Sequence, residues 1–241
     1  MTLAVAAVLF LATFVRSMFG FGEALIAVPL LALVIPVNVA TPIAALVSIT
    51  VAAVVVIEDW RHIQFRSAAW LIASTLFGIP GGLLLLTRVP EPIVKGLLAV
   101  VILAFSLQAF RTSGWRLATD RFAWIFGLAA GVLGGAYGMN GPPLAVYGSL
   151  RGWQPGEFRA TLQGYFLPAS AVGMGGYWMA GLWTPSVTRF YVTSLPAVLV
   201  AIVLGRFMNK RMTPRRFIPM VYVGLMIVGA VLLVQVAAFL C

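Results

Sequence analysis

The stretch "GGAYGMNGPPLAVY", residues 134–147, decides how this chain is interpreted. It lies inside a long apolar region, yet it carries several glycines, an asparagine and a Pro-Pro pair, which a straight membrane-spanning helix does not tolerate. A similar interruption, "FVRSMFGFGEALIAVPLLAL", occupies residues 14–33 and adds Arg16 and Glu23. Two interruptions of the same kind predict that the chain breaks two of its helices inside the apolar regions.

The composition places the chain in a membrane. Of its 241 residues, 62% are hydrophobic and only 9% are charged. So few charges cannot cover the surface of a water-soluble domain of this size. The apolar stretches also run continuously rather than as alternating ten-residue segments, which favours helices over a membrane barrel. We therefore predict an all-α polytopic membrane protein.

The chain divides into two similar halves. Six apolar runs are long enough to cross a bilayer core of ~30 Å, and they lie at residues 39–57, 67–87, 92–110, 160–181, 189–208 and 217–240. The interruptions fall in the two remaining apolar regions, 2–35 and 122–150, which align with each other at an offset of 118 residues. We expect a first membrane repeat at 1–110, a linker loop at 111–121 and a second membrane repeat at 122–241. Each repeat would hold a broken or re-entrant helix pair and three transmembrane helices.

The basic residues predict how the two repeats are oriented. If each broken region enters and leaves on the same face, the loops on one side carry twelve Lys and Arg residues and those on the other side carry three, Arg88, Lys95 and Arg189. If each broken region crosses once, the count is nine against six. The positive-inside rule prefers the first arrangement, with the basic loops cytoplasmic and both termini on the opposite side of the inner membrane. The two repeats are then inverted, as in many secondary transporters.

A helix that begins inside a membrane favours the binding of an anion, because its first N–H groups are unpaired and its dipole is positive at that end. Pro142 and Pro143 suit a first helical turn, since proline has no N–H to leave unpaired. We predict one half-helix that begins near Asn140–Pro142 and a counterpart that begins near Gly22–Glu23. The alternative is that the glycines only let helices pack closely. It explains the Asn-Gly-Pro-Pro turn less well than it explains Gly131, Gly134, Gly135, Gly173, Gly175 and Gly176.

Arg16 and Glu23 are the charges inside the predicted apolar regions, where an ionised side chain costs at least about 2.5–3.5 kcal/mol. One interpretation is an ion pair that closes the first break. The other gives Arg16 an anionic substrate and makes Glu23 a coupling group that accepts a proton. The candidate substrate-binding residues are Arg16, Phe19, Gly20, Phe21, Gly22, Glu23, Tyr137, Gly138, Met139, Asn140, Gly141 and Gln163.

Other kinds of site are not predicted. The chain has one cysteine and one histidine, which excludes a disulfide within the chain and a cysteine or histidine metal cluster. No serine–base pairing falls inside the spans, so we expect no enzyme and no cofactor. The net charge of +10 lies in loops between spans, where it fits lipid headgroups rather than nucleic acid.

Three segments together resemble the sulfite exporter TauE/SafE family of membrane permeases. They are "FGFGEALIAVPLLAL", "GGAYGMNGPPLAVY" and "FGIPGGLLL", the last of which contains Pro80. The resemblance extends over nearly the whole chain. It implies transport of a small sulfur-containing anion, such as sulfite or an organosulfonate like sulfoacetate, driven by an ion gradient.

We therefore expect a secondary transporter that works by alternating access, with a proton or another ion as the coupling partner. Two alternatives remain open from the residues alone. A passive small-anion channel can use the same half-helix electrostatics. A membrane subunit that transports nothing could dock a partner through its basic loops. A homodimer is also possible.

Overall fold

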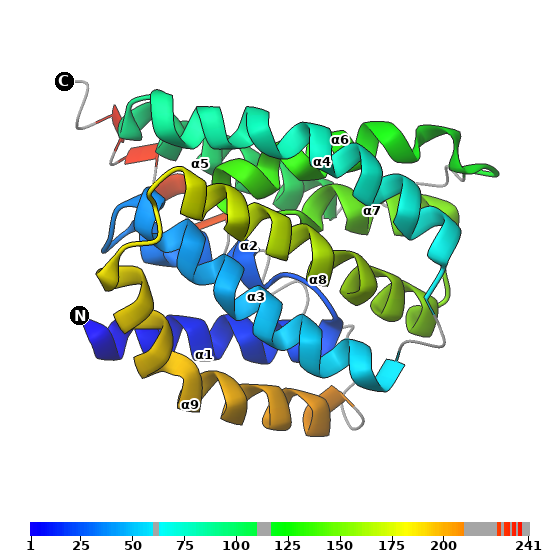
Figure 1. Ribbon diagram of the computed structural model, residues 1–241, viewed down its shortest axis with the longest axis horizontal. Coiled ribbons are helices and arrows are strands. Elements are labelled where there is room, and N and C mark those ends of the chain that lie inside the picture. The colour runs from blue at the N-terminus through cyan, green and yellow to red at the C-terminus, as the bar shows by residue number, and fades with distance from the viewer. Residues whose placement is uncertain are drawn as a thin grey trace.

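The computed structural model describes residues 1–59, 63–109 and 117–209, with isolated stretches at 226–227, 229–231, 233–234 and 236–237. Within these residues the fold is a bundle of helices without any strand (Figure 1). The long helices are α3 (Val37–Asp59), α4 (Phe65–Arg88), α5 (Glu91–Ala109), α8 (Pro155–Met179) and α9 (Pro185–Asn209). They match five of the six predicted spans to within a few residues. The sixth, at 217–240, lies mostly outside the described residues.

Three of the described helices are long and apolar enough to cross a membrane by length and composition. They lie at Val37–Val54, Phe65–Arg88 and Pro185–Met208. Their outward faces carry large apolar side chains such as Phe77, which is 80% exposed, and Val203, which is 67% exposed. A soluble domain would bury such side chains, so the surface of the bundle is suited to lipid.

Both interruptions break a helix where the sequence predicts. In the first, α1 (Thr2–Phe19) is followed by α2 (Glu23–Ala32); in the second, α6 (Ala123–Tyr137) is followed by α7 (Gly141–Arg151). Gly20, Gly22 and Gly138 adopt left-handed backbone angles, with φ of 86°, 96° and 65°. Glycine adopts this region readily because it has no Cβ, so these three positions permit the sharp turns.

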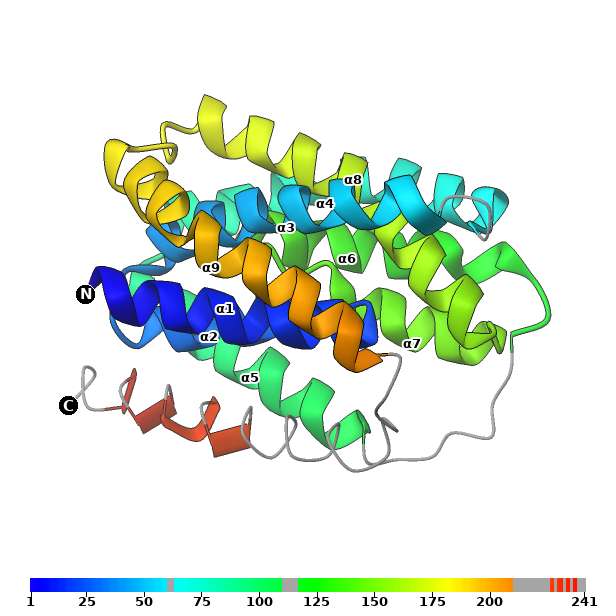
Figure 2. The same cartoon turned by 90° about the horizontal axis from the view of Figure 1, so that it is seen from below.

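The two broken regions are hairpins that open toward opposite ends of the bundle. In Figure 2, α1 starts at the N-terminal end of the bundle and α2 turns back toward it, whereas α6 starts at the other end and α7 turns back there. We call this other end, where Arg66, Arg121 and Arg151 lie, the basic end. At 1.5 Å per residue α1 is about 27 Å long and α6 about 22 Å long, so both turns lie within the bundle.

Close contact between glycines joins α4 to α6. A Cβ added at Gly78 or Gly82 would collide with the backbone of α6, and one at Gly131 or Gly135 would collide with the backbone of α4. This is the small-residue packing of membrane helices. The packing interpretation is therefore right for Gly131 and Gly135. It is wrong for Gly173, where nothing lies within 4 Å of an added Cβ.

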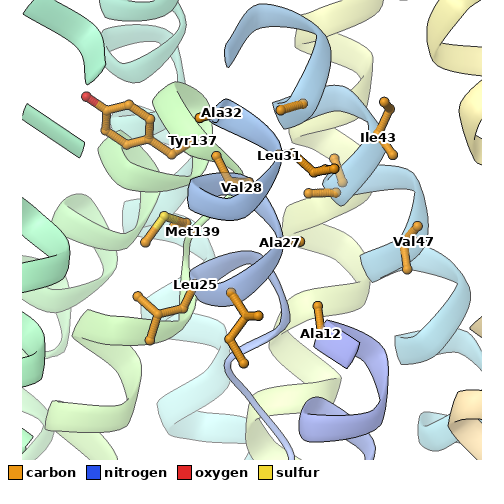
Figure 3. Close-up of a cluster of buried hydrophobic side chains, with 14 of the residues drawn as sticks. Ala12, Leu25, Ala27, Val28, Leu31, Ala32, Ile43, Val47, Tyr137 and Met139 are labelled. Atoms are coloured by element: carbon orange, nitrogen blue, oxygen red, sulfur yellow. The ribbon is translucent and has the colours of Figure 1, made fainter. Parts of the chain in front are cut away.

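The half-helix α2 sits in the middle of the largest hydrophobic core. Its Leu25 and Val28 point toward Met139 of the second break, while α3 contributes Ile43 and Val47 on the opposite side (Figure 3). All five side chains are buried. This packing holds the first turn of α2 beside the second break, where the candidate site lies.

Candidate anion-binding site

Arg16 is the centre of the site. It lies in the last turn of α1, only 3% exposed, and its guanidinium contacts three other elements. Nη1 donates to the Glu23 carboxylate and, at 2.7 Å, to the hydroxyl of Ser48 on α3. Nη2 donates to Oε1 of Gln163 on α8 at 2.8 Å. The ring of Phe166 lies 4.9 Å from the guanidinium carbon, within the range of a cation–π contact.

Gln163 also ties α8 to the turn between α1 and α2. Its Nε2 donates to the backbone oxygen of Gly20 at 2.6 Å, so its one amide bonds both Arg16 and the chain four residues beyond it. Ser170 lies about two turns after Gln163 on the same face of α8, and it donates to Ser48 at 3.1 Å. The result is a continuous polar cluster at the first break, built by α1, α2, α3 and α8.

A small cavity lies between the two breaks. It measures about 20 Å³, which is the room that one water-sized molecule needs. Its wall consists of Arg16, Gly22, Glu23, Ala24, Leu25, Ser48, Gly138, Met139, Asn140, Gly141, Pro142 and Phe166. The start of α2 and the start of α7 thus face the same space, as the half-helix prediction requires.

The two helix starts contribute differently to this cavity. Neither Gly22 nor Asn140 makes a side-chain cap, so the first N–H groups of each helix receive no side-chain acceptor. In α7, Pro142 and Pro143 have no N–H, which leaves Gly141 as the donor of its first turn. The site is therefore asymmetric, with most backbone donors and both charged side chains from the first break.

Two polar atoms of the cluster lack partners among the described residues. They are Nε of Arg16 and Oε1 of Glu23, both of them buried. A buried polar atom without a hydrogen bond costs about 1–3 kcal/mol, and more when the group is charged. Unsatisfied atoms next to a cavity indicate that this cluster can accept a further polar molecule.

The second break has its own polar network without charge. Asn140 donates to the hydroxyl of Tyr165 at 3.4 Å, and that hydroxyl is 2.6 Å from the hydroxyl of Thr75. Tyr177 donates to the carbonyl of Gly134. A second cavity of about 10 Å³ lies here, and its lining includes Ser170, Gly173 and Tyr177. Gly138 and Asn140 line both cavities, so the two are neighbours.

A scan against protein-family models matches residues 5–232 to the sulfite exporter TauE/SafE family. The match covers most of the chain and includes both breaks. This chain belongs to the TauE/SafE family. Searches of the curated proteins and of the solved structures give no match. Members of the family are membrane exporters of sulfite and related sulfur anions, so this chain belongs to a family of transport proteins. Within the described residues no group of histidine, cysteine and acidic side chains could hold a metal ion.

Most of the predicted site residues of this TauE/SafE chain lie together. Arg16, Gly22, Glu23, Gly138, Met139, Asn140 and Gly141 line the first cavity. Gln163 and the carbonyl of Gly20 bond directly to each other beside it. Gln163 is buried, and both ends of its amide have partners inside the bundle.

Two predicted residues point elsewhere, and one is not described. The hydroxyl of Tyr137 donates to the carbonyl of Val94 on α5 at 2.9 Å, so its side chain leaves the site, as Figure 3 shows. Phe21 packs edge-on against Phe158 with ring centres 5.8 Å apart and does not line the cavity. Phe19 ends α1, and its side chain lies outside the described part of the structure.

Three residues of the cluster were not among the predicted site residues. Phe166 and Ser170 lie three and seven positions after Gln163, so they share its helix face. That spacing is the signal that could have found them. Ser48 is a polar residue on a span, but serine in a membrane helix more often bonds its own backbone, so the sequence alone does not assign it to a site. Only its contacts with Arg16 and Ser170 place it in the site.

Proposed function

We propose that this protein is a secondary transporter that moves a small sulfur-containing anion, sulfite or an organosulfonate such as sulfoacetate, across the cytoplasmic membrane. The observation that carries the proposal is the buried guanidinium of Arg16 beside the uncapped start of α2. Arginine presents several donors in one plane, and a helix start adds a positive dipole, so both favour an oxyanion. The family membership supplies the sulfur chemistry.

The contact between Arg16 and Glu23 suggests how the anion enters the site. In this conformation the Glu23 carboxylate occupies the anion position at Arg16. The cavity of about 20 Å³ has no room for an oxyanion of several atoms beside it. The substrate must therefore displace Glu23, and the carboxylate acts as an internal competitor for the same guanidinium.

Displacement of Glu23 provides a physical basis for coupling. A carboxylate that loses its cation inside the membrane is costly when ionised, so it takes up a proton as the anion binds. When Glu23 releases that proton and returns to Arg16, it expels the anion. Glu23 would thus link anion movement to a proton gradient. The ion-pair interpretation and the coupling interpretation describe two states of one cycle.

The opposite openings of the two hairpins support alternating access between inverted repeats. The first repeat, residues 1–110, would gate the N-terminal end, and the second, 122–241, would gate the basic end, with 111–121 as the linker. Under the positive-inside rule the basic end faces the cytoplasm of the inner membrane. A homodimer and specific lipids are compatible with this arrangement, and the two neighbouring cavities would also suit a passive anion channel.

Uptake into proteoliposomes tests the proposal. Sulfite, sulfoacetate, taurine and chloride are compared with and without an imposed pH gradient. We expect one sulfur anion to accumulate against its gradient, and only when the pH gradient is present. Downhill flux of every anion, chloride included, would instead establish a channel. The Arg16→Ala protein is the control: it should show no uptake, and gel filtration checks that it remains folded.

A further inference from the structure

A hollow at the basic end lies outside the site described above. It has a volume of about 660 Å³ and lies between the start of α4, the turn before α6 and the end of α7. Its lining consists of Arg66, Trp70, Ala118, Thr119, Asp120, Arg121, Trp124 and Arg151. Three of these eight side chains are cationic, and one is acidic.

Asp120 and Arg151 largely compensate each other. Nε of Arg151 lies 3.2 Å from Oδ1 of Asp120, which makes an ion pair without a hydrogen bond. Nη1 of Arg151 donates to the Leu117 carbonyl at 2.8 Å. Oδ1 of Asp120 also accepts hydrogen bonds from Ser67 at 2.9 Å and Tyr147 at 2.6 Å. Asp120 therefore joins the elements around the hollow, and its carboxylate already has Arg151, Ser67 and Tyr147 as partners.

Arg66 and Arg121 are the cations that remain available. Both are exposed, and neither makes a hydrogen bond or ion pair with another described residue. They come from two different segments, the first turn of α4 and the short 3₁₀ helix at Asp120–Phe122. The charge of Arg66 also acts on Asp120, but Asp120 is the single acidic side chain among three arginines in the lining, so the hollow keeps a positive charge. Two guanidinium groups that face one hollow favour an oxyanion such as a phosphate group.

Two tryptophans show where the hollow lies relative to a bilayer. Trp70 and Trp124 are 57% and 55% exposed at the edge of the hollow. Tryptophan is enriched at the level of lipid headgroups, because its ring is apolar and its N–H is polar. The two rings therefore place the hollow in the headgroup layer rather than in the surrounding water.

Apolar side chains continue from each tryptophan toward the middle of the bundle. On α4, Phe77 and Leu84 follow Trp70 at intervals of seven residues and are 80% and 58% exposed. On α6, Leu128 and Val132 follow Trp124 at intervals of four. Residues at these spacings share one face of a helix. Since α4 and α6 are packed through their glycines, the two apolar faces are neighbours.

We propose that this hollow is a binding site for an anionic phospholipid of the leaflet at the basic end. Arg66 and Arg121 hold the headgroup phosphate, the two tryptophans flank the glycerol, and the acyl chains lie along the exposed faces of α4 and α6. Basic pockets between membrane helices bind acidic headgroups in this way. The site does not depend on the transport function, because it shares no residue with the Arg16 cluster.

Native mass spectrometry of the purified full chain in detergent tests the site, with phosphatidylglycerol or phosphatidylcholine titrated in. The test variant is Arg66→Gln/Arg121→Gln, and the matched control is Arg88→Gln/Arg189→Gln, which removes two exposed arginines from the opposite end. All four arginines are exposed, so both variants should fold. Each basic residue near an anionic headgroup contributes roughly a fivefold factor in binding.

We expect the wild-type chain to bind phosphatidylglycerol more tightly than phosphatidylcholine. The test variant should lose about 30-fold in affinity for phosphatidylglycerol and less in affinity for phosphatidylcholine, because the choline of that lipid compensates the charge of its phosphate. The control variant should bind both lipids as the wild-type chain does. Equal losses in the test and control variants would overturn the proposal, because they would indicate general charge attraction. Displacement of the lipid by millimolar inorganic phosphate would also overturn it, because the hollow would then be a site for a soluble anion.

Discussion

The guanidinium of Arg16 donates to Oε1 of Gln163 at 2.8 Å, across 147 positions of the sequence. The same glutamine donates back to the carbonyl of Gly20, so one side chain of the second half of the chain holds both the cation and the turn of the first half. Any movement that opens the first break must either break these two bonds or carry α8 along with it. The link therefore makes Gln163 part of the conformational change as well as of the site.

The Arg16–Glu23 pair predicts an unusual pattern of stability. Arg16→Met leaves the Glu23 carboxylate buried without its cation, and loss of one partner of a buried pair costs about 3–5 kcal/mol. Arg16→Met/Glu23→Leu removes both charges, so we expect it to recover most of that loss. Thermal unfolding in detergent measures both. A double variant that is no more stable than the single one would show that the pair is not the source of the effect.

Glu23→Gln tests the coupling role separately from folding. Glutamine has the shape of glutamate but carries no charge and takes up no proton, so Arg16 is freed for the anion. We expect the variant to bind the anion more tightly and to lose the acceleration of uptake by an imposed pH gradient. Proteoliposome uptake with and without that gradient measures this. Persistent concentrative uptake driven by pH in the variant would assign the coupling proton to another group.

Gln163→Leu removes both of the amide's hydrogen bonds while it keeps a side chain of similar size. We expect a loss of about 1–3 kcal/mol in stability, because Gly20 and Arg16 each lose a partner. Anion uptake should fall by at least about tenfold. Gln64→Leu is the matched control, since Gln64 is exposed and its amide bonds Glu157 at the surface. Comparable effects of the two substitutions on uptake would remove Gln163 from the site.

Local chemistry explains why the breaks could be predicted from the sequence. Glycines with positive φ and a Pro-Pro pair permit few backbone paths, so the starts of α2 at Glu23 and of α7 at Gly141 follow from neighbouring residues. Arg16 and Glu23 were predictable for a similar reason, because a charge inside an apolar region requires a partner.

The rest of the site depends on packing between distant elements. Ser48 joins the cluster only because α3 and α8 lie side by side at that level. Tyr137 is one of the predicted site residues and aligns with Phe19 at the offset of 118 residues between the repeats. Its hydroxyl instead donates to the Val94 carbonyl on α5, and the alignment between the repeats does not predict such a contact.

The environment of Asp120 at the basic end makes the stability of the folded protein depend on pH. Burial raises the pKa of its carboxyl, but hydrogen bonds from Tyr147 and Ser67 and the charges of Arg151 and Arg66 lower it more, so the folded pKa lies below the usual range. The stabilisation is then complete above the unfolded pKa of about 4 and is lost as pH falls through the folded value. Asp120→Asn should be less stable than wild type at pH 7 and less sensitive to acid below pH 4. Thermal unfolding over this pH range checks both, and parallel curves would contradict the assignment.

We expect the anion to pass from the Arg16 cluster through the second cavity, beside Gly173. This glycine is buried, it lines the second cavity, and an added Cβ there would meet no atom within 4 Å. Its lack of a side chain therefore keeps space open rather than allowing close packing. Gly173→Leu should block that space and reduce uptake by at least about tenfold. A leucine side chain is larger than the cavity of about 10 Å³, so we also expect a loss of about 1–3 kcal/mol in stability from overpacking.

Gly175→Leu is the control for this substitution. Gly175 also has nothing within 4 Å of an added Cβ, but it lies about 200° around α8 and is partly exposed. Both variants gain the same side chain in the same helix, so a difference in their uptake reports the cavity alone. If both variants transport at the wild-type rate, the second cavity is a packing defect, and the anion leaves the Arg16 cluster by another route.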